Sequence, residues 1–380
     1  MLASSLFLWY NFVMKITEVT LQNFRNYKYE TVKLSPYVNV FYGANAQGKT
    51  NFLESLRFMS IGKSMRTGKE KELIRWDEEN ARLKAEIMGE KVKKRVDISL
   101  FKTGGKKVRI NNLPITKIGE LMGVLTTVLF SPDEIGIIKN SPSDRRRFID
   151  IALCQLSKAY FYALSKYNKI LAQRNSLLKS GKTDENSLYV WDVQLASEGA
   201  RIAKSRAGFI KRLEECASEN HAFLSDGKEK LTLGYEGVYA PTIEEICDKM
   251  MENLKTDREK DIKQGYTHSG IQTDDLKVEV NGVDLRKFGS QGQQRTGALS
   301  LKLAEVDIYK QESGEYPVLL LDDVFSELDK TRQTRLVEKI SGMQTVITCT
   351  NFDFSYPENV IKYFAVENGK ITEKTEVFIS

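Results

Sequence analysis

The sequence has few of the residues on which metal and disulfide chemistry depend. Its 380 residues include four cysteines, none of them in a C-x-x-C pair, and only two histidines, His221 and His268. This excludes a disulfide framework and a zinc ribbon, and it leaves little scope for histidine-based metal catalysis. We expect a reduced, cytoplasmic protein.

Long hydrophobic runs are also lacking. A membrane-spanning helix needs about 20 apolar residues, and the longest apolar stretch, residues 1–13, falls short of that and carries no Lys or Arg. We therefore expect no membrane association and interpret residues 1–13 as an extension upstream of a natural start at Met14. A hydrophobic fraction of 41% and a charged fraction of 28% are typical of a globular protein. The length suggests two or three domains.

A phosphate-binding motif lies near the N-terminus. The segment 43–50 reads GANAQGKT, which fits G-x-x-x-x-G-K-[ST] and lies between an apolar strand pattern and an amphipathic helix pattern. Glycines let backbone N–H groups wrap a phosphate, and the following helix points its positive end at it. Lys49 would reach the β- and γ-phosphates, and the hydroxyl of Thr50 would bind Mg²⁺.

Two aspartates follow a continuous apolar run late in the chain. The run Val318–Leu321 predicts a strand buried on both faces, with Asp322 and Asp323 at its carboxyl end, where open α/β sheets bind ligands. Asp322 could hold Mg²⁺, and Asp323 could polarise or deprotonate an attacking water.

A polar segment, SQGQQR at 290–295, opens a predicted helix over 291–311. Ser290 and Gly292 at a helix N-terminus could bind an anion through backbone amides, although helix capping alone would explain Ser290.

The order of predicted elements gives the domain plan. Strand patterns cover 14–42 and 81–110, with a hairpin turn at Gly104-Gly105. Helical patterns over 143–179 and 189–224, the second interrupted by Gly199 and Gly208, predict an antiparallel hairpin. Helix 291–311, strand 318–321, helix 329–341 and strand 345–350 follow. We predict an α/β domain built from both ends of the chain, 14–130 and 276–380, with a mainly α-helical lobe over 131–275 between them.

The motifs in this order resemble the ABC-type ATPases, and in detail the RecF family of SMC-like ATPase heads. The similar segments are KITEVTLQNFRNY (15–27), 39–51, LFSPDE (129–134), SPSDRRRFID (141–150), GSQGQQRT (289–296) and LLLDDVFSELD (319–329). The resemblance implies an ABC-type head with a helical insertion. It also implies a DNA repair and replication protein that closes as an ATP-dependent homodimer on DNA at single-strand gaps.

The resemblance further implies how the site works. ATP would lie between the phosphate loop of one subunit and the signature of the other, with recombination mediators of RecR and RecO type as partners. Lys49 and Asp323 would be catalytic, Thr50 and Asp322 would hold Mg²⁺, and nucleotide contacts would come from Gly43, Ala44, Asn45, Ala46, Gln47, Gly48, Lys49, Thr50, Asn51, Ser290, Gly292 and Gln293. Most ABC ATPases have Glu where Asp323 stands, and a His where Thr348-Cys-Thr350 stands, so we expect slow hydrolysis. The resemblance identifies no residue for the glutamine loop, and it assigns no role to 265–275.

DNA contact is predicted from charge. The net charge is only +6, but residues 91–109 hold eight basic side chains and one acidic one. Such a patch attracts phosphate backbones, although a solvated hairpin face would look similar. The arginines at 145–147 could contact phosphate or pair with nearby carboxylates. The candidate residues are Lys91, Lys93, Lys94, Arg95, Lys106, Lys107, Arg145, Arg146 and Arg147.

Two other classes compete with this interpretation. The nucleotide-binding subunit of a transporter would have an L-S-G-G-Q-like signature and a shorter helical insertion. A DNA scaffold that does not hydrolyse ATP would need no intact phosphate loop and aspartate pair.

Overall fold

The computed structural model describes residues 14–89, 92–181, 185–350 and 361–374, and our expectation for residues 1–13 lies outside them. The chain forms two compact units. One combines Met1–Glu134 with Glu305–Ser380, and the other is Ile135–Ala304. Both ends of the chain thus build one unit, as predicted for an ABC-type head with a helical insertion. The finer three-part division at 130 and 275 stays a prediction.

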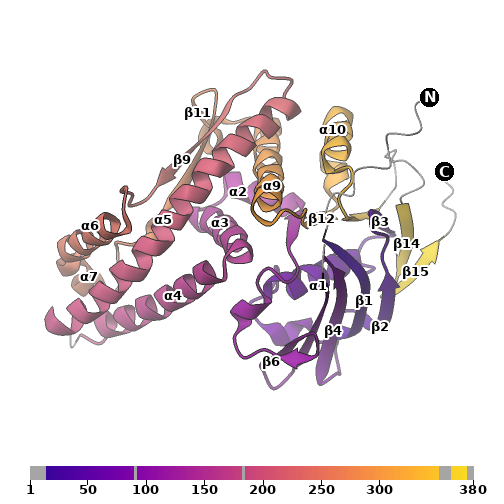
Figure 1. The fold of residues 1–380 in the computed structure, drawn as a ribbon, viewed down its shortest axis with the longest axis horizontal. Helices are drawn as coiled ribbons and strands as arrows, with labels where there is room; N and C mark the ends of the chain where they lie inside the picture. Colours follow the sequence, from indigo (N-terminus) through magenta and orange to yellow (C-terminus); the bar gives the residue numbers. More distant parts are fainter. Residues whose placement is uncertain (1–13, 90–91, 182–184, 351–360, 375–380) are drawn as a thin grey trace. The chain divides into compact units, whose positions relative to one another are not determined.

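The first unit contains a mainly parallel sheet of strands from distant parts of the chain (Figure 1). Strand β3 (Val38–Tyr42) pairs in parallel with β13 (Thr345–Cys349) on one side and with β14 (Ile361–Glu367) on the other. The order continues through β12 (Val318–Asp322) to β8 (Thr127–Phe130), and β15 (Lys370–Lys374) closes the other edge. The run Val318–Leu321 is fully buried, as the sequence predicted.

This unit also contains an antiparallel sheet. Its order is β2-β1-β4-β5-β6-β7, from strands Tyr27–Lys33, Lys15–Phe24, Asn80–Met88, Lys93–Phe101, Lys106–Ile110 and Leu113–Pro114. Helix α1 (Lys49–Ile61) contacts strands of both sheets through buried Phe52, Leu53 and Leu56. The predicted turn at Gly104-Gly105 joins β5 to β6, and both glycines have positive φ.

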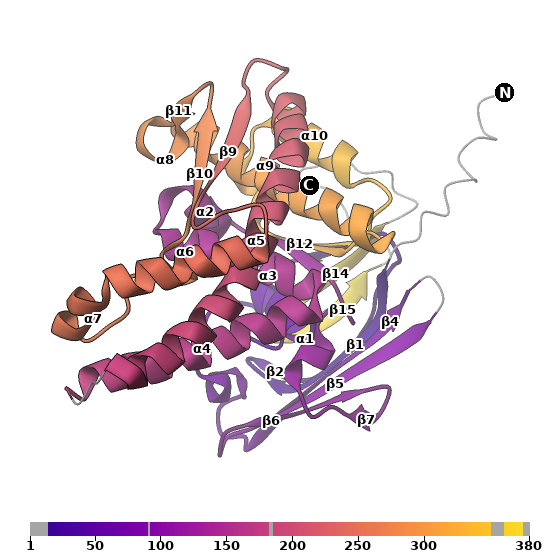
Figure 2. The same cartoon turned by 60° about the vertical axis from the view of Figure 1, so that its left-hand side comes forward.

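The second unit is mainly helical. Helices α4 (Lys158–Lys179) and α5 (Glu185–Leu224) lie side by side, and α6 (Ile243–Thr256) packs on α5 (Figures 1 and 2). Strands β9 (Leu231–Glu236), β10 (Asp275–Val280) and β11 (Val283–Asp284) form a small sheet. The remaining helices include α2 (Gly136–Lys139), α3 (Pro142–Leu156), α7 (Arg258–Gln264) and α8 (Leu285–Phe288). Helix α9 (Gln291–Ser313) begins here and α10 (Lys330–Ile340) belongs to the first unit.

Two details of the helical prediction were wrong. The single helix expected over 143–179 is interrupted at Ser157, whose extended backbone ends α3 and whose hydroxyl accepts the Tyr160 N–H to cap α4. Conversely, Gly199 does not interrupt α5. A Cβ at Gly199 would lie 2.9 Å from Met250 Sδ, so this glycine allows close helix packing.

Strands β8, β14 and β15 were not predicted. β8 has four residues, and a short apolar run does not distinguish a strand from a buried helix turn, while β15 is mostly exposed. Among the helices that the structure describes, none combines the length and apolarity that a membrane span requires.

Candidate nucleotide-binding site

The loop at 43–50 follows β3 at the carboxyl end of the parallel sheet and leads directly into α1. Gly43 and Gly48 have φ of 148° and 121°, which side-chain-bearing residues rarely adopt. A Cβ at Gly43 would lie 2.4 Å from the carbonyl oxygen of Val366, and one at Gly48 would meet the amide of Asn26 at 2.6 Å. Both glycines are therefore required by backbone shape and by space.

Lys49 is buried and turned back over this loop. Its Nζ donates to the carbonyl oxygens of Gly43 at 2.6 Å and Ala44 at 2.8 Å. Burial lowers the pKa of Lys49, and the nearby Cys349, Asp323 and Asp322 oppose that effect. Because its hydrogen-bond partners are neutral carbonyls, its positive charge is available to an anion bound in the loop.

Asp322 lies at the end of β12 and accepts two hydroxyl hydrogen bonds on one oxygen. Thr50 Oγ1 is 3.0 Å and Thr348 Oγ1 is 2.6 Å from Asp322 Oδ1. The two predicted metal-binding residues are thus in direct contact, although they are 272 positions apart. A carboxylate and a hydroxyl are hard oxygen donors of the kind Mg²⁺ prefers, so these residues fit that ion.

Asp323 begins the turn after β12 in a left-handed backbone conformation, with φ of 52°. Its N–H donates to Thr348 O at 3.1 Å and to Thr348 Oγ1 at 3.2 Å. Burial raises the pKa of its carboxyl group, and the charge of Asp322 acts in the same direction. A carboxylate with a raised pKa is a better proton acceptor, which suits the role of general base.

Thr348 is a site residue that sequence reasoning missed. It donates to Asp322, and its hydroxyl and carbonyl oxygens accept from the Asp323 N–H, so it holds the carboxylate of Asp322 and the backbone of Asp323. The available signal was the family comparison, in which Thr348-Cys-Thr350 stands where most ABC ATPases have a His; the pairing of this strand with β12 was not visible in the sequence.

A second set of residues that the sequence analysis missed holds the phosphate loop through Gln47. Asn26 Nδ2 donates to the Gln47 carbonyl at 2.7 Å, and Asn51 Nδ2 donates to Asn26 Oδ1 at 2.9 Å. On the other side, the N–H groups of Asn368 and Gly369, in the turn between β14 and β15, donate to Gln47. Asn26 belongs to the segment 15–27 that carries the family resemblance, which was the available signal. Asn368 had none.

The exposed part of the loop is formed by Ala44, Asn45 and Ala46. Ala46 has a φ of 65°, a left-handed conformation. With Gln47 held on two sides, the loop keeps its shape while its tip faces solvent.

The signature segment lies in the second unit, at the start of α9. Gln293 N–H donates to Ser290 Oγ at 3.2 Å, and Ser290 N–H donates to Gln293 Oε1 at 3.0 Å, which is a capping box. The capping role that we considered for Ser290 is therefore present. Ser290 is exposed and Gly292 is half-buried.

The basic candidates on β5 and β6 are in different situations. Lys93 is exposed and lies 2.8 Å from Glu86, and Arg95 is 3.6 Å from the same carboxylate. Lys107 is exposed and lies over the Phe101 ring, and Lys94 is half-buried. Lys106 instead bonds the Gly62 carbonyl at 2.6 Å and the carboxylate of Glu70, so its charge is taken up within the chain. Lys91 lies outside the described residues.

The arginines at 145–147 need a correction. Arg145 is 3% exposed and forms a bidentate ion pair with Asp275, at 2.6 and 2.9 Å. Arg146 donates to the carbonyl oxygen of Asp274, and burial lowers its pKa. Arg145 and Arg146 therefore have a structural role rather than the predicted role in DNA contact, because their guanidinium groups bind Asp275 and Asp274 within the second unit. Arg147 is exposed.

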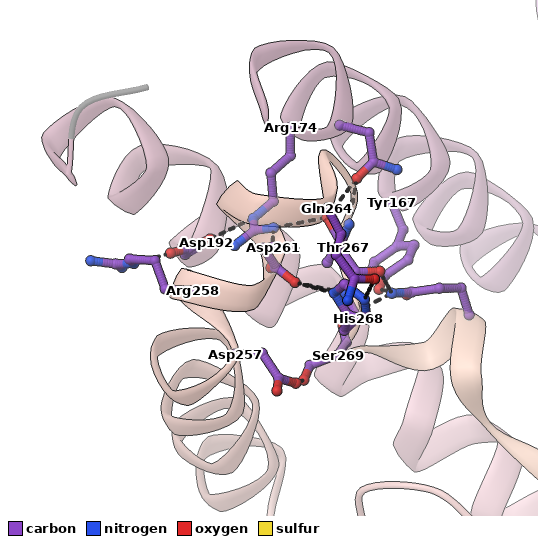
Figure 3. Close-up of polar contacts among 12 residues, drawn as sticks. Tyr167, Arg174, Asp192, Asp257, Arg258, Asp261, Gln264, Thr267, His268 and Ser269 are labelled. Carbon is purple, nitrogen blue, oxygen red and sulfur yellow. Dashed lines mark hydrogen bonds and ion pairs between the residues drawn. The ribbon is translucent and has the colours of Figure 1, made fainter. Parts of the chain in front are cut away.

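Residues 265–275, to which the sequence assigned no role, close a buried polar cluster (Figure 3). Arg174 is fully buried between Asp192 at 2.7 Å and Asp261 at 2.6 Å. Thr267 also accepts from Arg174, and His268 Nδ1 lies 2.7 Å from Asp261. Three helices and this segment are thereby joined through charged side chains.

Together, the sheet, the phosphate loop and the paired aspartates define an ATPase head of the ABC type. Comparison with solved structures agrees: an SMC head domain from Pyrococcus furiosus aligns with a TM-score of 0.55 at 17% identity, over 95% of this chain and 96% of that one, which shows the fold. The family model "RecF/RecN/SMC N terminal domain" matches residues 15–372.

Closer relatives give the particular family. The chain is 43% identical to the DNA replication and repair protein RecF of Clostridium tetani, over 95% of this chain and 100% of that one, and 44% identical to that of Clostridium kluyveri, over 94% and 100%. A structure described as the recombination mediator protein RecF with ATP aligns with a TM-score of 0.90 at 36% identity, over 96% of this chain and 99% of that chain. The chain belongs to the RecF family.

Proposed function

We propose that this chain is an ATP-dependent DNA repair and replication protein that dimerises on ATP and clamps DNA at single-strand gaps, where it helps to load a recombinase. Slow ATP hydrolysis, stimulated by DNA, would release the clamp. The observation that carries this proposal is the contact of Thr50 and Thr348 with Asp322 beneath the phosphate loop. Relatives named as DNA replication and repair proteins support the biological role.

The residues at the loop have distinct tasks in this proposal. Lys49 would exchange its two carbonyl partners for phosphate oxygens, and the loop N–H groups would hold the same phosphates. Thr50 and Asp322 would hold Mg²⁺, which neutralises phosphate charge when bound. Asp323 would orient or deprotonate the attacking water. Its side chain is one methylene shorter than the Glu common in ABC ATPases, which favours slow turnover.

The signature would act in trans. Ser290 is exposed at the positive end of α9, a helix of more than five turns, so it can meet the γ-phosphate bound to a second copy. Ser290→Arg should leave ATP binding intact and abolish ATP-dependent dimerisation, measured by light scattering. Ser313→Arg, at the other end of α9, is the matched control. Normal ATP dimers of the Ser290 variant would refute the trans arrangement.

The residues proposed to contact DNA are Lys93, Lys94, Arg95 and Lys107 in the first unit and, separately, Arg147 in the second. Such side chains would contact the phosphate backbone without base-specific recognition. Mediators of RecR and RecO type, and a cytoplasmic location, belong to the proposal through the family; a solved relative is described as part of a RecFOR pathway.

Steady-state ATP hydrolysis with and without gapped duplex DNA tests the proposal directly. We expect stimulation that falls as salt rises, because phosphate contacts release counterions. Hydrolysis unaffected by DNA would remove the basic surface from the mechanism. An absence of hydrolysis with intact ATP binding would favour the DNA scaffold over the switch.

A further inference from the structure

The signature capping box is linked to a buried histidine that the proposed function does not use. His221, at the end of α5, is fully buried, and its Nε2 lies 3.0 Å from Glu229 Oε2. The other carboxylate oxygen, Glu229 Oε1, accepts a hydrogen bond of 2.8 Å from Gln293 Nε2. Glu229 therefore joins α5 to the first turn of α9 through its two oxygens.

Proton positions determine the direction of each bond. A carboxylate oxygen accepts hydrogen bonds, so His221 Nε2 carries a proton. On the opposite side of the ring, His221 Nδ1 is 3.0 Å from Ser300 Oγ, whose hydroxyl donates to Thr296 O at 2.7 Å. His221 is thus held between α9 and Glu229, and Glu229 is held by His221.

The orientation of the Gln293 amide depends on Glu229. The two ends of a glutamine amide have nearly the same shape, but only the oxygen can accept the Ser290 N–H in the capping box. With the oxygen there, the NH₂ group faces Glu229; a reversed amide would put its oxygen against the carboxylate and its NH₂ against an N–H.

The capping box in turn sets the hydroxyl of Ser290. Ser290 Oγ accepts the Gln293 N–H, so its hydroxyl hydrogen can point outward to an anion. We propose that Glu229, held by His221, is a positioning residue for the signature: it fixes the Gln293 amide, and through it the Ser290 hydroxyl that meets ATP in trans. This inference rests on the proposed function.

Glu229→Ala removes both acceptors and tests the inference. We expect ATP binding to the monomer to be unchanged, while ATP-dependent dimerisation, followed by light scattering with ATP and Mg²⁺ at pH 8, requires at least about tenfold more protein. Asp226→Asn is the matched control, because Asp226 is an exposed carboxylate in the same connection, and its ion pair with Lys228 is long, at 3.9 Å. This control should dimerise like the wild type.

Conservative variants separate positioning from general damage. Glu229→Gln should restore most of the dimerisation at pH 8, because His221 with its proton on Nδ1, toward Ser300 Oγ, can accept at Nε2 from the NH₂ group of the introduced amide, while the amide oxygen still accepts from Gln293. Glu229→Asp keeps the charge but withdraws the oxygens by one methylene, so it should remain weak. It also provides the test if Glu229→Ala does not fold.

The outcomes distinguish the two proposals. Wild-type dimerisation of Glu229→Ala, or of Glu229→Asp if the former is unfolded, overturns the positioning role, provided that Ser290→Arg blocks dimerisation. If Ser290→Arg also dimerises normally, the trans signature itself fails. Equal losses in the Ala and Gln variants would likewise overturn the inference, since a rescue is expected.

Discussion

Two polar clusters in this protein use buried charge in opposite ways. In the helical unit, Arg174 is fully buried between two carboxylates that are themselves at most 1% exposed, and Arg258, 2.8 Å from Asp192, supplies the second positive charge that balances them (Figure 3). At the phosphate loop, Lys49 is held by neutral carbonyls and Asp322 by neutral hydroxyls. The charges of the first cluster balance without a ligand. In the second, the charge of Lys49 is available to an anion and that of Asp322 to a cation.

The comparison offers a rule for finding sites. Buried ion pairs whose charges are balanced within the protein join structural elements. A buried charge that has only neutral hydrogen-bond partners instead indicates a ligand of opposite charge. Substitutions should therefore affect stability in the first cluster and ligand binding in the second.

The largest effect is expected for Arg174→Met. It leaves Asp192 and Asp261 buried without their shared cation, which should lower the free energy of unfolding by about 3–5 kcal/mol. Urea unfolding measures this. Lys166→Met removes an ion pair whose lysine is 61% exposed and should change stability by less than about 1 kcal/mol. Equal effects of the two substitutions would break the comparison.

The next largest effect is expected for Asp275→Asn, whose loss of stability should depend on pH. Burial alone would raise the Asp275 pKa, but hydrogen bonds from Arg145 and the Leu276 N–H lower it below its usual 3.8. Its contribution to stability is therefore present above pH 4 or so and is lost as pH falls through the depressed pKa. At pH 7 the variant should lose about 1.5–3 kcal/mol, and at pH 2 the difference should shrink. A difference that is constant with pH would contradict the ion pair.

Lys49→Ala tests the ligand-directed cluster. ATP affinity should fall by about 10–100-fold, since one charge-assisted interaction with phosphate is lost. Thermal unfolding without nucleotide should shift little, because the Lys49 ammonium bonds neutral carbonyls. Lys71→Ala, an exposed lysine of the same unit, should keep full affinity. A strongly destabilised Lys49 variant would mean that this charge is structural.

Thr348→Val should give the smallest effect. Loss of the hydroxyl between the two aspartates is expected to slow ATP hydrolysis about tenfold, with ATP binding maintained. Thr345→Val, on the same strand, removes a hydroxyl that donates to Met343 O and should hydrolyse ATP normally. Similar rates in both variants would remove Thr348 from the site.

The sequence predicted the motifs well because they are local. The phosphate loop from Gly43 to Thr50 and the strand before Asp322 can each be recognised from a short stretch of sequence. The order of motifs in the family that the chain resembles then indicated that the two belong to one site. Thr348, Asn368 and Glu229 could not be predicted, since each acts through a partner distant in the sequence. The sequence left both phosphate contact and carboxylate pairing open for Arg145, because charge composition does not show that Asp275, 130 positions away, is its partner.

The helices show the same division. Apolar periodicity placed α4 and α5. It did not show the interruption at Ser157, where a single hydroxyl caps α4, or the place of Gly199 inside α5, where Met250 packs closely. Those are properties of the folded neighbours, which periodicity does not contain.

The position of β3 has a consequence for synthesis. The strand that presents the phosphate loop is hydrogen-bonded on both sides by β13 and β14, which the ribosome makes more than 300 residues later. A nascent chain therefore carries the nucleotide motif long before it has the strands that flank it. Domains usually fold from the N-terminal end as they emerge, whereas here the sheet that supports the loop cannot form until strands more than 300 residues downstream have been made.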